Sequence, residues 1–303
     1  MIYVSGAPGI VALDLVRRLS RRGEDVRVLV QTAKDIGLSG LPRVEMVVGD
    51  LHDAPSFEKT LTGVDGVFVS STLGPALRPY SNLISTAVSG IRAQKSLVDA
   101  AQRAGVRHVV KLSWMGASEA APRLLTARWH AEVESHVQGS GVPFTILRAN
   151  NFMQHYLHSI TRANENTLLG AAGGGRCSLV DARDVAAVAA HVLTDDGHER
   201  KTYEITGPGA LTHAEAAAVI ANVTGREIRY IEHSLEELSA IYHYAGWPSR
   251  WADELVAAEE LQALGLLSAV TDVVERMTGK RPTTFEEFVR KAYAAGGPTA
   301  DDS

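Results

Sequence analysis

The chain has 303 residues, enough for one large α/β domain or for one domain with a smaller partner. Its residues are 45% hydrophobic and 21% charged, with a formal net charge of −5, so no basic excess points to a nucleic-acid partner. A single cysteine, Cys177, excludes an internal disulfide framework and a cysteine-rich zinc site. No apolar run reaches the length of a membrane span and no signal-peptide pattern precedes the first strand, so we expect a cytoplasmic protein without a membrane partner.

Strand and helix patterns alternate through the first half of the chain. Apolar, β-branched runs typical of strands buried on both faces of a parallel sheet occupy residues 2–5, 26–30, 44–48, 64–71, 108–113 and 143–148. Apolar residues recur at helical spacing over residues 10–19, 80–104 and 125–138. Because strands separated by helices join through right-handed crossovers, the pattern predicts an α/β fold with a doubly wound parallel sheet, the Rossmann architecture.

The alternation loosens from about Asn151 onward. Short strand candidates occupy residues 177–180, 202–206 and 228–233. Alanine-rich helices are expected over residues 184–193 and 213–223, and the last third, residues 235–295, is expected to be almost wholly helical. We therefore expect a Rossmann core over residues 1–150. Residues 151–303 should form a smaller, mainly helical substrate-binding lobe, with parts of 177–206 returning to the core.

The segment SGAPGIVA at 5–12 has the spacing of a dinucleotide phosphate cradle. Gly6 permits a tight turn after the strand, Gly9 permits close approach at the helix start, and Ala12 only has to let the helix pack near the strand. Pro8 is expected in the first helical turn, where its missing N–H would have no intrahelical partner. Alone, such a match is as common in plain strand-to-helix turns; its place between a strand and an amphipathic helix favours dinucleotide binding.

The residue after the second strand bears on which dinucleotide is bound. An acid there binds the free ribose hydroxyl and an arginine binds a 2′-phosphate, but this chain has Gln31. Lys34 could supply a cation for the phosphate, although a solvated surface lysine is an equal alternative. The sequence therefore favours NADP (NADPH) and leaves NAD open.

Seven segments, in this order and spacing, resemble the NmrA-like branch of the atypical short-chain dehydrogenase/reductases, which includes triphenylmethane reductases and NADPH quinone oxidoreductases. They are SGAPGIVA, VVGDLHD (47–53), HVVKLSWMGA (108–117), the segment 130–154, VDARDVAAVAAHVL (180–193), TYEITGPGALTHAEAAAVI (202–220) and TGKRPTTFEEFV (278–289). The resemblance implies NAD(P)H-dependent transfer of hydride to a small aromatic, quinone or ketone substrate, held in a cleft between the Rossmann domain and the smaller lobe. A monomer or a homodimer is expected.

The resemblance also assigns cofactor contacts by position. It implies pyrophosphate contacts from Gly6, Ala7, Pro8, Gly9, Ile10 and Val11, adenine contacts from Asp50 and Leu51, and contacts on the ribose and nicotinamide side from Ser70 and Ser71, with Gln31, Lys34 and Asn150 as further candidates. Gln31 stands where an arginine is usual, which weakens the expectation of strong 2′-phosphate selectivity. Ala12 for the usual glycine is a milder departure.

The catalytic side chains are less clear, because none of the eight tyrosines has a lysine four residues later and the usual Tyr-x-x-x-Lys pair is absent. The resemblance places His130 where relatives have a catalytic lysine or histidine. We expect it at the start of a helix, where the dipole would favour neutral imidazole, although a histidine that touches only water would fit the same pattern. Lys111 and Ser113 fall near the same strand ends as further candidates, each as a general acid–base group or as a positioning hydrogen-bonder.

A substrate pocket could be lined by Trp114, Met115, Asn151, Phe152 and Tyr156, although such residues are as often ordinary core. No histidine, cysteine or carboxylate spacing suggests a metal site. Two alternatives to a reductase stay open. One is a non-catalytic NAD(P)-binding regulatory or sensor protein, and the other is an isomerase or dehydratase on the same fold.

Overall fold

The computed structural model describes residues 1–32, 36–70, 83–117, 124–156 and 166–294. Two expected cofactor contacts, Lys34 and Ser71, lie outside these residues, so their roles remain predictions. No helix within these described ranges combines the length and the apolar character that crossing a bilayer would require.

The predicted doubly wound parallel sheet is confirmed. Seven parallel strands form it in the order β3-β2-β1-β4-β5-β6-β8. Their bounds are β1 (Ile2–Val4), β2 (Val26–Val30), β3 (Val44–Val48), β4 (Gly66–Val69), β5 (His108–Trp114), β6 (Phe144–Ala149) and β8 (Lys201–Ile205). The chain builds outward from β1 to β3 and then returns to β4 on the other side of β1. The topological switch point therefore lies between β1 and β4, where ligands of such sheets bind.

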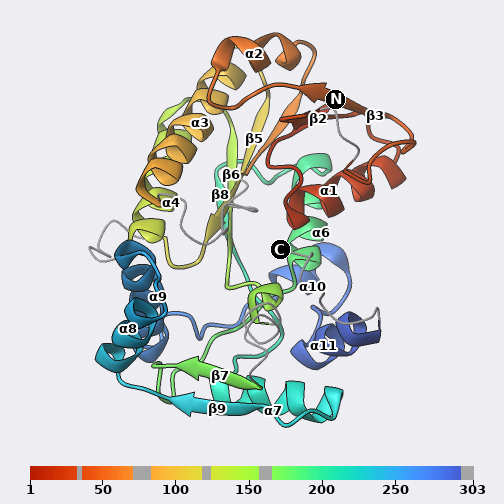
Figure 1. Ribbon diagram of the computed structural model, residues 1–303. Coiled ribbons are helices and arrows are strands. Elements are labelled where there is room, and N and C mark those ends of the chain that lie inside the picture. The colour runs from red at the N-terminus through yellow and green to blue at the C-terminus, as the bar shows by residue number, and fades with distance from the viewer. Residues whose placement is uncertain (33–35, 71–82, 118–123, 157–165, 295–303) are drawn as a thin grey trace.

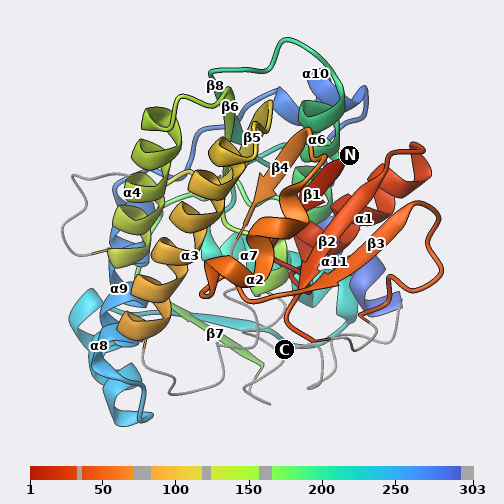
Figure 2. The same cartoon turned by 90° about the horizontal axis from the view of Figure 1, so that it is seen from above.

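Helices cover both faces of this sheet (Figures 1 and 2). One face is covered by α2 (Ala54–Glu58), α3 (Leu83–Arg103) and α4 (Leu125–Gly139), and the other by α1 (Ile10–Arg21), α6 (Ala182–Thr194) and α10 (Val273–Thr278). The remaining elements are η1 (Lys59–Leu61), α7 (His213–Thr224), α8 (Leu235–Tyr244), α9 (Ser249–Ala263), α11 (Phe285–Ala294), β7 (Thr167–Gly170) and β9 (Arg229–Glu232).

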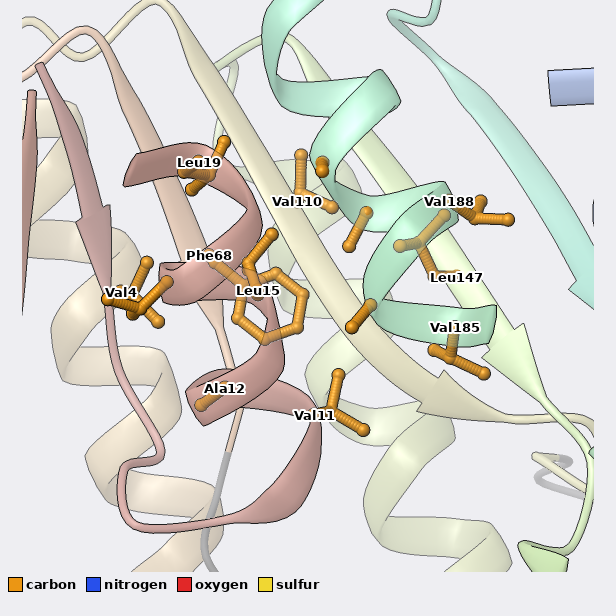
Figure 3. Packing of buried hydrophobic residues seen from close by; sticks show 14 of the residues in the cluster. Val4, Val11, Ala12, Leu15, Leu19, Phe68, Val110, Leu147, Val185 and Val188 are labelled. Atoms are coloured by element: carbon orange, nitrogen blue, oxygen red, sulfur yellow. The ribbon is translucent and has the colours of Figure 1, made fainter. Parts of the chain in front are cut away.

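Strand residues alternate between the two covering layers, as a sheet buried on both faces requires. Tyr3 packs with α2 and α3, whereas its neighbour Val4 packs with α1 and α6. Figure 3 shows the layer of α1 and α6, in which Leu15 of α1 lies beside Phe68 of β4 and Val185 of α6 lies on the side of Leu147 of β6. The paired strands therefore hold their carboxyl ends at one edge, where the candidate residues lie.

The second half of the chain departs from the sequence expectation in one segment. Residues 177–180 were expected to form a strand, but they make only two isolated bridges, Phe152 to Val180 and Cys177 to Leu211. The segment is a connecting loop, and its residues are mostly apolar because all four are buried. The strand β7, whose short sequence TLLG gave no signal, pairs instead with β9 in a separate two-stranded sheet. Figure 1 shows this sheet with α7 at the end of the molecule opposite α2.

We expect Gly6→Ala to lower the free energy of unfolding by about 2 kcal/mol, since a left-handed backbone costs an L-residue about 1–2 kcal/mol and a steric clash adds to this. Gly6 has φ +88°, and a Cβ there would lie 2.9 Å from Ser70 Cβ. Urea denaturation measures the change. Gly209→Ala is the matched control, because that glycine has no positive φ and open space around it. Equal losses in the two variants would contradict the argument.

Candidate active site

The turn after β1 is joined to the end of β4 across the switch point. Gly9 N–H donates to Gly6 O at 2.8 Å and closes the turn. The Ser5 hydroxyl donates to Phe68 O at 2.9 Å and to Ser70 O at 3.1 Å, and Ser70 N–H donates to the Ser5 hydroxyl at 3.1 Å. Since Gly6 leaves no space for a Cβ beside Ser70, backbone and hydroxyl groups of two strands meet directly here.

Pro8 was expected inside the first helical turn, and that expectation is wrong. The helix α1 begins at Ile10 with Gly9 as its N-cap, so Pro8 lies in the preceding turn. Pro8 and Ile10 are exposed, whereas Ala7 and Val11 are buried in the core under the turn. The proline is tolerated because the turn closes through Gly9 N–H and needs no N–H from Pro8.

The start of α1 fits a bound pyrophosphate. No side chain caps this end in the part of the chain that the structure describes, and its first turn holds no acid. By contrast, α7 begins with a capping box formed by Thr212 and Glu215. Among the described residues, the first N–H groups of α1 therefore have no side-chain acceptor, and the helix dipole favours an anion at this end.

The ends of β2 and β3 lie at the same edge of the sheet. Gln31 follows β2 and is exposed, and Asp50 and Leu51 follow β3. His52 N–H donates to Asp50 Oδ1 at 2.9 Å, and Asp50 N–H donates to the Ser56 hydroxyl at 2.8 Å, so this loop is held in place. Leu51 packs against the α2 and α3 layer. The structure thus brings these expected nucleotide contacts to one edge with the Gly6 turn.

Lys111 is a buried lysine in the middle of β5. Its register partner on β4 is Val69, the residue before Ser70, so it lies beside the switch point. The side chain is only 1% exposed, its Nζ donates to Leu112 O, and Nζ lies 3.4 Å from His130 Nδ1. Burial lowers the pKa of Lys111 to about 7, and the nearby carboxylate of Glu134 opposes part of that fall.

His130 lies in the second turn of α4 and not at the start of the helix as expected, because α4 begins at Leu125. The helix dipole therefore does not explain its charge state. Burial lowers the pKa of His130 well below its usual value, and the positive charge of Lys111 lowers this pKa further. The imidazole is neutral at physiological pH, as the sequence predicted, but for a different reason. His130 is partly exposed, whereas Lys111 is almost completely buried.

A buried carboxylate that sequence reasoning missed fixes α4 against the sheet. Glu134 is 3% exposed and accepts two hydrogen bonds from Arg148 Nε, at 3.0 and 3.2 Å, and one from Arg148 Nη2 at 2.6 Å. The Ser113 hydroxyl donates to its Oε1 at 2.5 Å. Glu134 comes four residues after His130, a spacing that places both on one helical face and was available from the sequence. Ser113 contributes here by positioning Glu134.

A second missed carboxylate comes from the distant helix α9. Glu254 is 6% exposed and accepts from Leu125 N–H at 2.5 Å, from Thr126 N–H at 3.2 Å and from the Thr126 hydroxyl at 2.9 Å. It thereby caps the start of α4, the helix that carries His130. No sequence signal could have paired these residues, since they lie more than a hundred positions apart.

The expected substrate residues lie at the end of β5 or follow β5 and β6. Trp114 Nε1 donates to Asn151 Oδ1 at 2.9 Å, so these two form one unit. Met115 is half-buried, and its N–H donates to Ala149 O at 2.9 Å. Phe152 packs against the core layer of α1 and α6. The side chains of Trp114 and Asn151 are thus in contact, whereas Phe152 packs in a different cluster from Trp114, and the substrate role of these residues stays a prediction.

Asn150 and Tyr156 are engaged by the protein itself. The Asn150 amide donates to the Ser178 hydroxyl at 2.7 Å and to Leu267 O at 2.9 Å, and the residue is 1% exposed. The Tyr156 hydroxyl lies 2.6 Å from His213 Nδ1, whose Nε2 lies 3.0 Å from Glu259 Oε2. Burial raises the pKa of Tyr156 well above its usual value. No group of three metal-ligating side chains occurs within the described ranges.

We expect Lys111→Met to flatten the pH dependence of stability between pH 7 and about 10.4, the reference pKa of lysine. The folded pKa of Lys111 lies near 7, so in this window the unfolded chain holds a proton that the folded chain lacks. The wild type therefore gains stability as pH rises, by up to about 1.4 kcal/mol per pH unit, and the variant lacks this gain. Urea denaturation at pH 7, 8 and 9 measures both slopes. Lys201→Met, at an exposed position on β8, is the control, and equal slopes in wild type and Lys111→Met would contradict the assignment.

The sequence and the structure of this chain are both similar to those of known reductases. An NAD(P)H azoreductase from Xenophilus azovorans is 34% identical, covering 98% of this chain and 99% of its own. The structure of the NADPH-dependent quinone oxidoreductase from Escherichia coli, complexed with NADPH, superposes with a TM-score of 0.83 at 26% identity, covering 97% and 100% of the two chains. The Citrobacter sp. triphenylmethane reductase complexed with NADP(H) superposes with a TM-score of 0.78 at 25% identity, covering 96% and 100%.

The family assignment covers nearly the whole chain. Residues 1–289 match the model of the NmrA-like family, and the azoreductase exceeds 30% identity over almost the full length of both proteins. With the parallel sheet, the glycine turn and the segments after β5 and β6 in the expected places, these matches lead to one conclusion: the chain belongs to the NmrA-like family.

Proposed function

We infer from the family and its named relatives that the chain is an NAD(P)H-dependent oxidoreductase, and we propose that it reduces a flat, conjugated acceptor such as a quinone or an aromatic dye. The observation that carries the proposal is the start of α1, which has no side-chain cap among the described residues and follows the Gly6 turn against Ser70, together with the contact between Lys111 of β5 and His130 of α4. The proposed phosphate cradle at the switch point and the two nitrogen groups are thus linked through β4.

The turn from Gly6 to Val11 would hold the pyrophosphate through backbone N–H groups, and Asp50 and Leu51 would bound the adenine. Ser70 would face the nicotinamide side, and the cofactor would supply the hydride once bound. NADPH is the favoured form, with Lys34 as the proposed 2′-phosphate contact. The acceptor would lie between the core over residues 1–150 and the lobe over residues 151–303.

The named relatives support a conjugated acceptor, since they reduce azo compounds, quinones or triphenylmethane dyes by their names. Reduction of a quinone or an azo group leaves an oxygen or nitrogen that must gain a proton. His130 is the partly exposed nitrogen group beside β5, so it would donate to that atom. Trp114 and Phe152 would contact the planar rings.

Gly9→Asp should abolish binding of NADPH and NADH, because a carboxylate at the start of α1 would repel the pyrophosphate. Calorimetric titration of wild type and variant measures this directly. Gly209→Asp, at an exposed position, is the control for added charge. Equal affinities in wild type and Gly9→Asp would contradict the cradle, whereas binding without oxidation of NADPH by any quinone or dye would favour a regulatory sensor.

His130→Ala should lower kcat by about 10²–10⁴-fold, the usual contribution of a general acid–base group, and change cofactor affinity far less. Stopped-flow kinetics with NADPH and a quinone separates the two quantities. His130→Gln can still donate a hydrogen bond, so partial recovery would show that hydrogen bonding dominates. Activity of both variants within a few-fold of the wild type would remove His130 from the proposed mechanism.

A further inference from the structure

His130 and Lys111 divide between them two properties that a proton donor needs. His130 is partly exposed, but its neutral imidazole is a very weak acid at physiological pH. Lys111 releases its proton near neutrality, but at 1% exposure it cannot reach a bound molecule. The two groups are in contact, with Lys111 Nζ 3.4 Å from His130 Nδ1. Neither group alone can deliver a proton, but the pair can.

We propose that Lys111 supplies the proton for the reduced acceptor and that the imidazole of His130 carries it, receiving at Nδ1 and releasing from Nε2. The inference rests on the proposed reductase function and deepens it. The contact itself sets the direction of transfer. Since the ammonium group has no lone pair, it can only donate to Nδ1, and a neutral imidazole that accepts at Nδ1 must carry its hydrogen on Nε2.

The transfer balances without any further reactant. The acceptor, reduced by hydride, carries an electron pair on oxygen or nitrogen, which takes the hydrogen from His130 Nε2 as that N–H bond breaks. The N–H bond of Lys111 Nζ breaks at the same time, and a new N–H bond forms at His130 Nδ1. Lys111 ends as a neutral amine and His130 as the other neutral tautomer. Water then returns one proton to the pair.

The charged groups near Lys111 come from α4 and β6, and its Nζ also donates to Leu112 O. The helix α4 contributes His130 and the carboxylate of Glu134. Arg148 on β6 donates hydrogen bonds to that carboxylate through both Nε and Nη2. The neighbouring register partners on β4 and β6, Val69 and Ile146, are apolar. No ion pair to Lys111 occurs among the residues that the structure describes, so no direct carboxylate contact locks its proton in place.

The first test needs neither cofactor nor acceptor. Nitrogen-15 NMR of the histidine rings in the whole protein reports the tautomer of His130 at each pH. We expect the Nε2–H tautomer at pH 6 in the wild type, and a chemical-shift change with a midpoint near pH 7 that Lys111→Met abolishes and the control Lys201→Met retains. A wild-type His130 with its hydrogen on Nδ1 at pH 6, or a midpoint that survives Lys111→Met, would overturn the proposal.

The second test follows quinone reduction by NADPH from pH 5.5 to 9. Wild-type kcat should fall above about pH 7 as Lys111 loses its proton, and Lys111→Met should lower kcat at pH 6.5 about 100-fold with KM and NADPH affinity little changed. Lys111→Arg keeps a charged donor toward Nδ1 but releases no proton, so it should lose as much kcat as Lys111→Met. Lys201→Met should match the wild type.

The outcomes separate the relay from the function on which it rests. Near-wild-type kcat in Lys111→Arg would mean that the lysine only orients the ring and that solvent supplies the proton, which overturns the relay while the reductase stands. A wild type that binds NADPH but oxidises it with no quinone or dye would overturn the proposed function instead. A curved dependence of wild-type kcat on the deuterium fraction of the solvent, made linear by Lys111→Met, would support two protons moving together.

Discussion

The buried carboxylate of Glu134 is the interaction on which the arrangement of the site depends. It joins three elements, because α4 carries it while Arg148 of β6 and Ser113 of β5 bond to it. A buried ion pair contributes little net stability, since desolvation offsets most of the attraction, but breaking one side of it is costly. Such a contact therefore fixes geometry more than it adds stability. Fixing Glu134 also fixes the direction of His130 one helical turn earlier.

The other end of the site is held by contacts of a different kind. Between β1 and β4, Ser5 and Gly6 meet Ser70 through a hydroxyl and a bare backbone, with no charged group involved. One half of the site thus depends on close approach, and the other half on a buried charge. The two halves share β4, because Ser70 follows Val69 on that strand and the register pairs Val69 with Lys111 of β5. The fold aligns two independently built halves through strand pairing alone.

Local patterns predicted the sheet and the glycine turn, because alternation along a strand and the conformation of Gly6 depend on near neighbours. The errors arose where distant residues decide. The helix over 125–138 was predicted with its correct start, so placing His130 at the start of a helix was inconsistent with that range, whereas the cap that Glu254 of α9 provides carries no local signal. The apolar residues at 177–180 were read as a strand because burial by surrounding helices gives the same pattern. The Lys111–His130 contact was equally invisible, although both residues had been singled out.

The covering of the sheet by α6 and α10 has a consequence for how the protein is made. Valines of α6 and α10, such as Val185 and Val274, close the face on which Val28 and Phe68 lie, yet they are encoded far behind these strands. On the ribosome, α1 can cover part of this face early, but the part that α6 and α10 cover stays open until those helices have been synthesised. A nascent chain arrested after β6 would expose an apolar surface that chaperones recognise. The covering of this face is therefore completed only by helices that follow all but one of the strands that they cover.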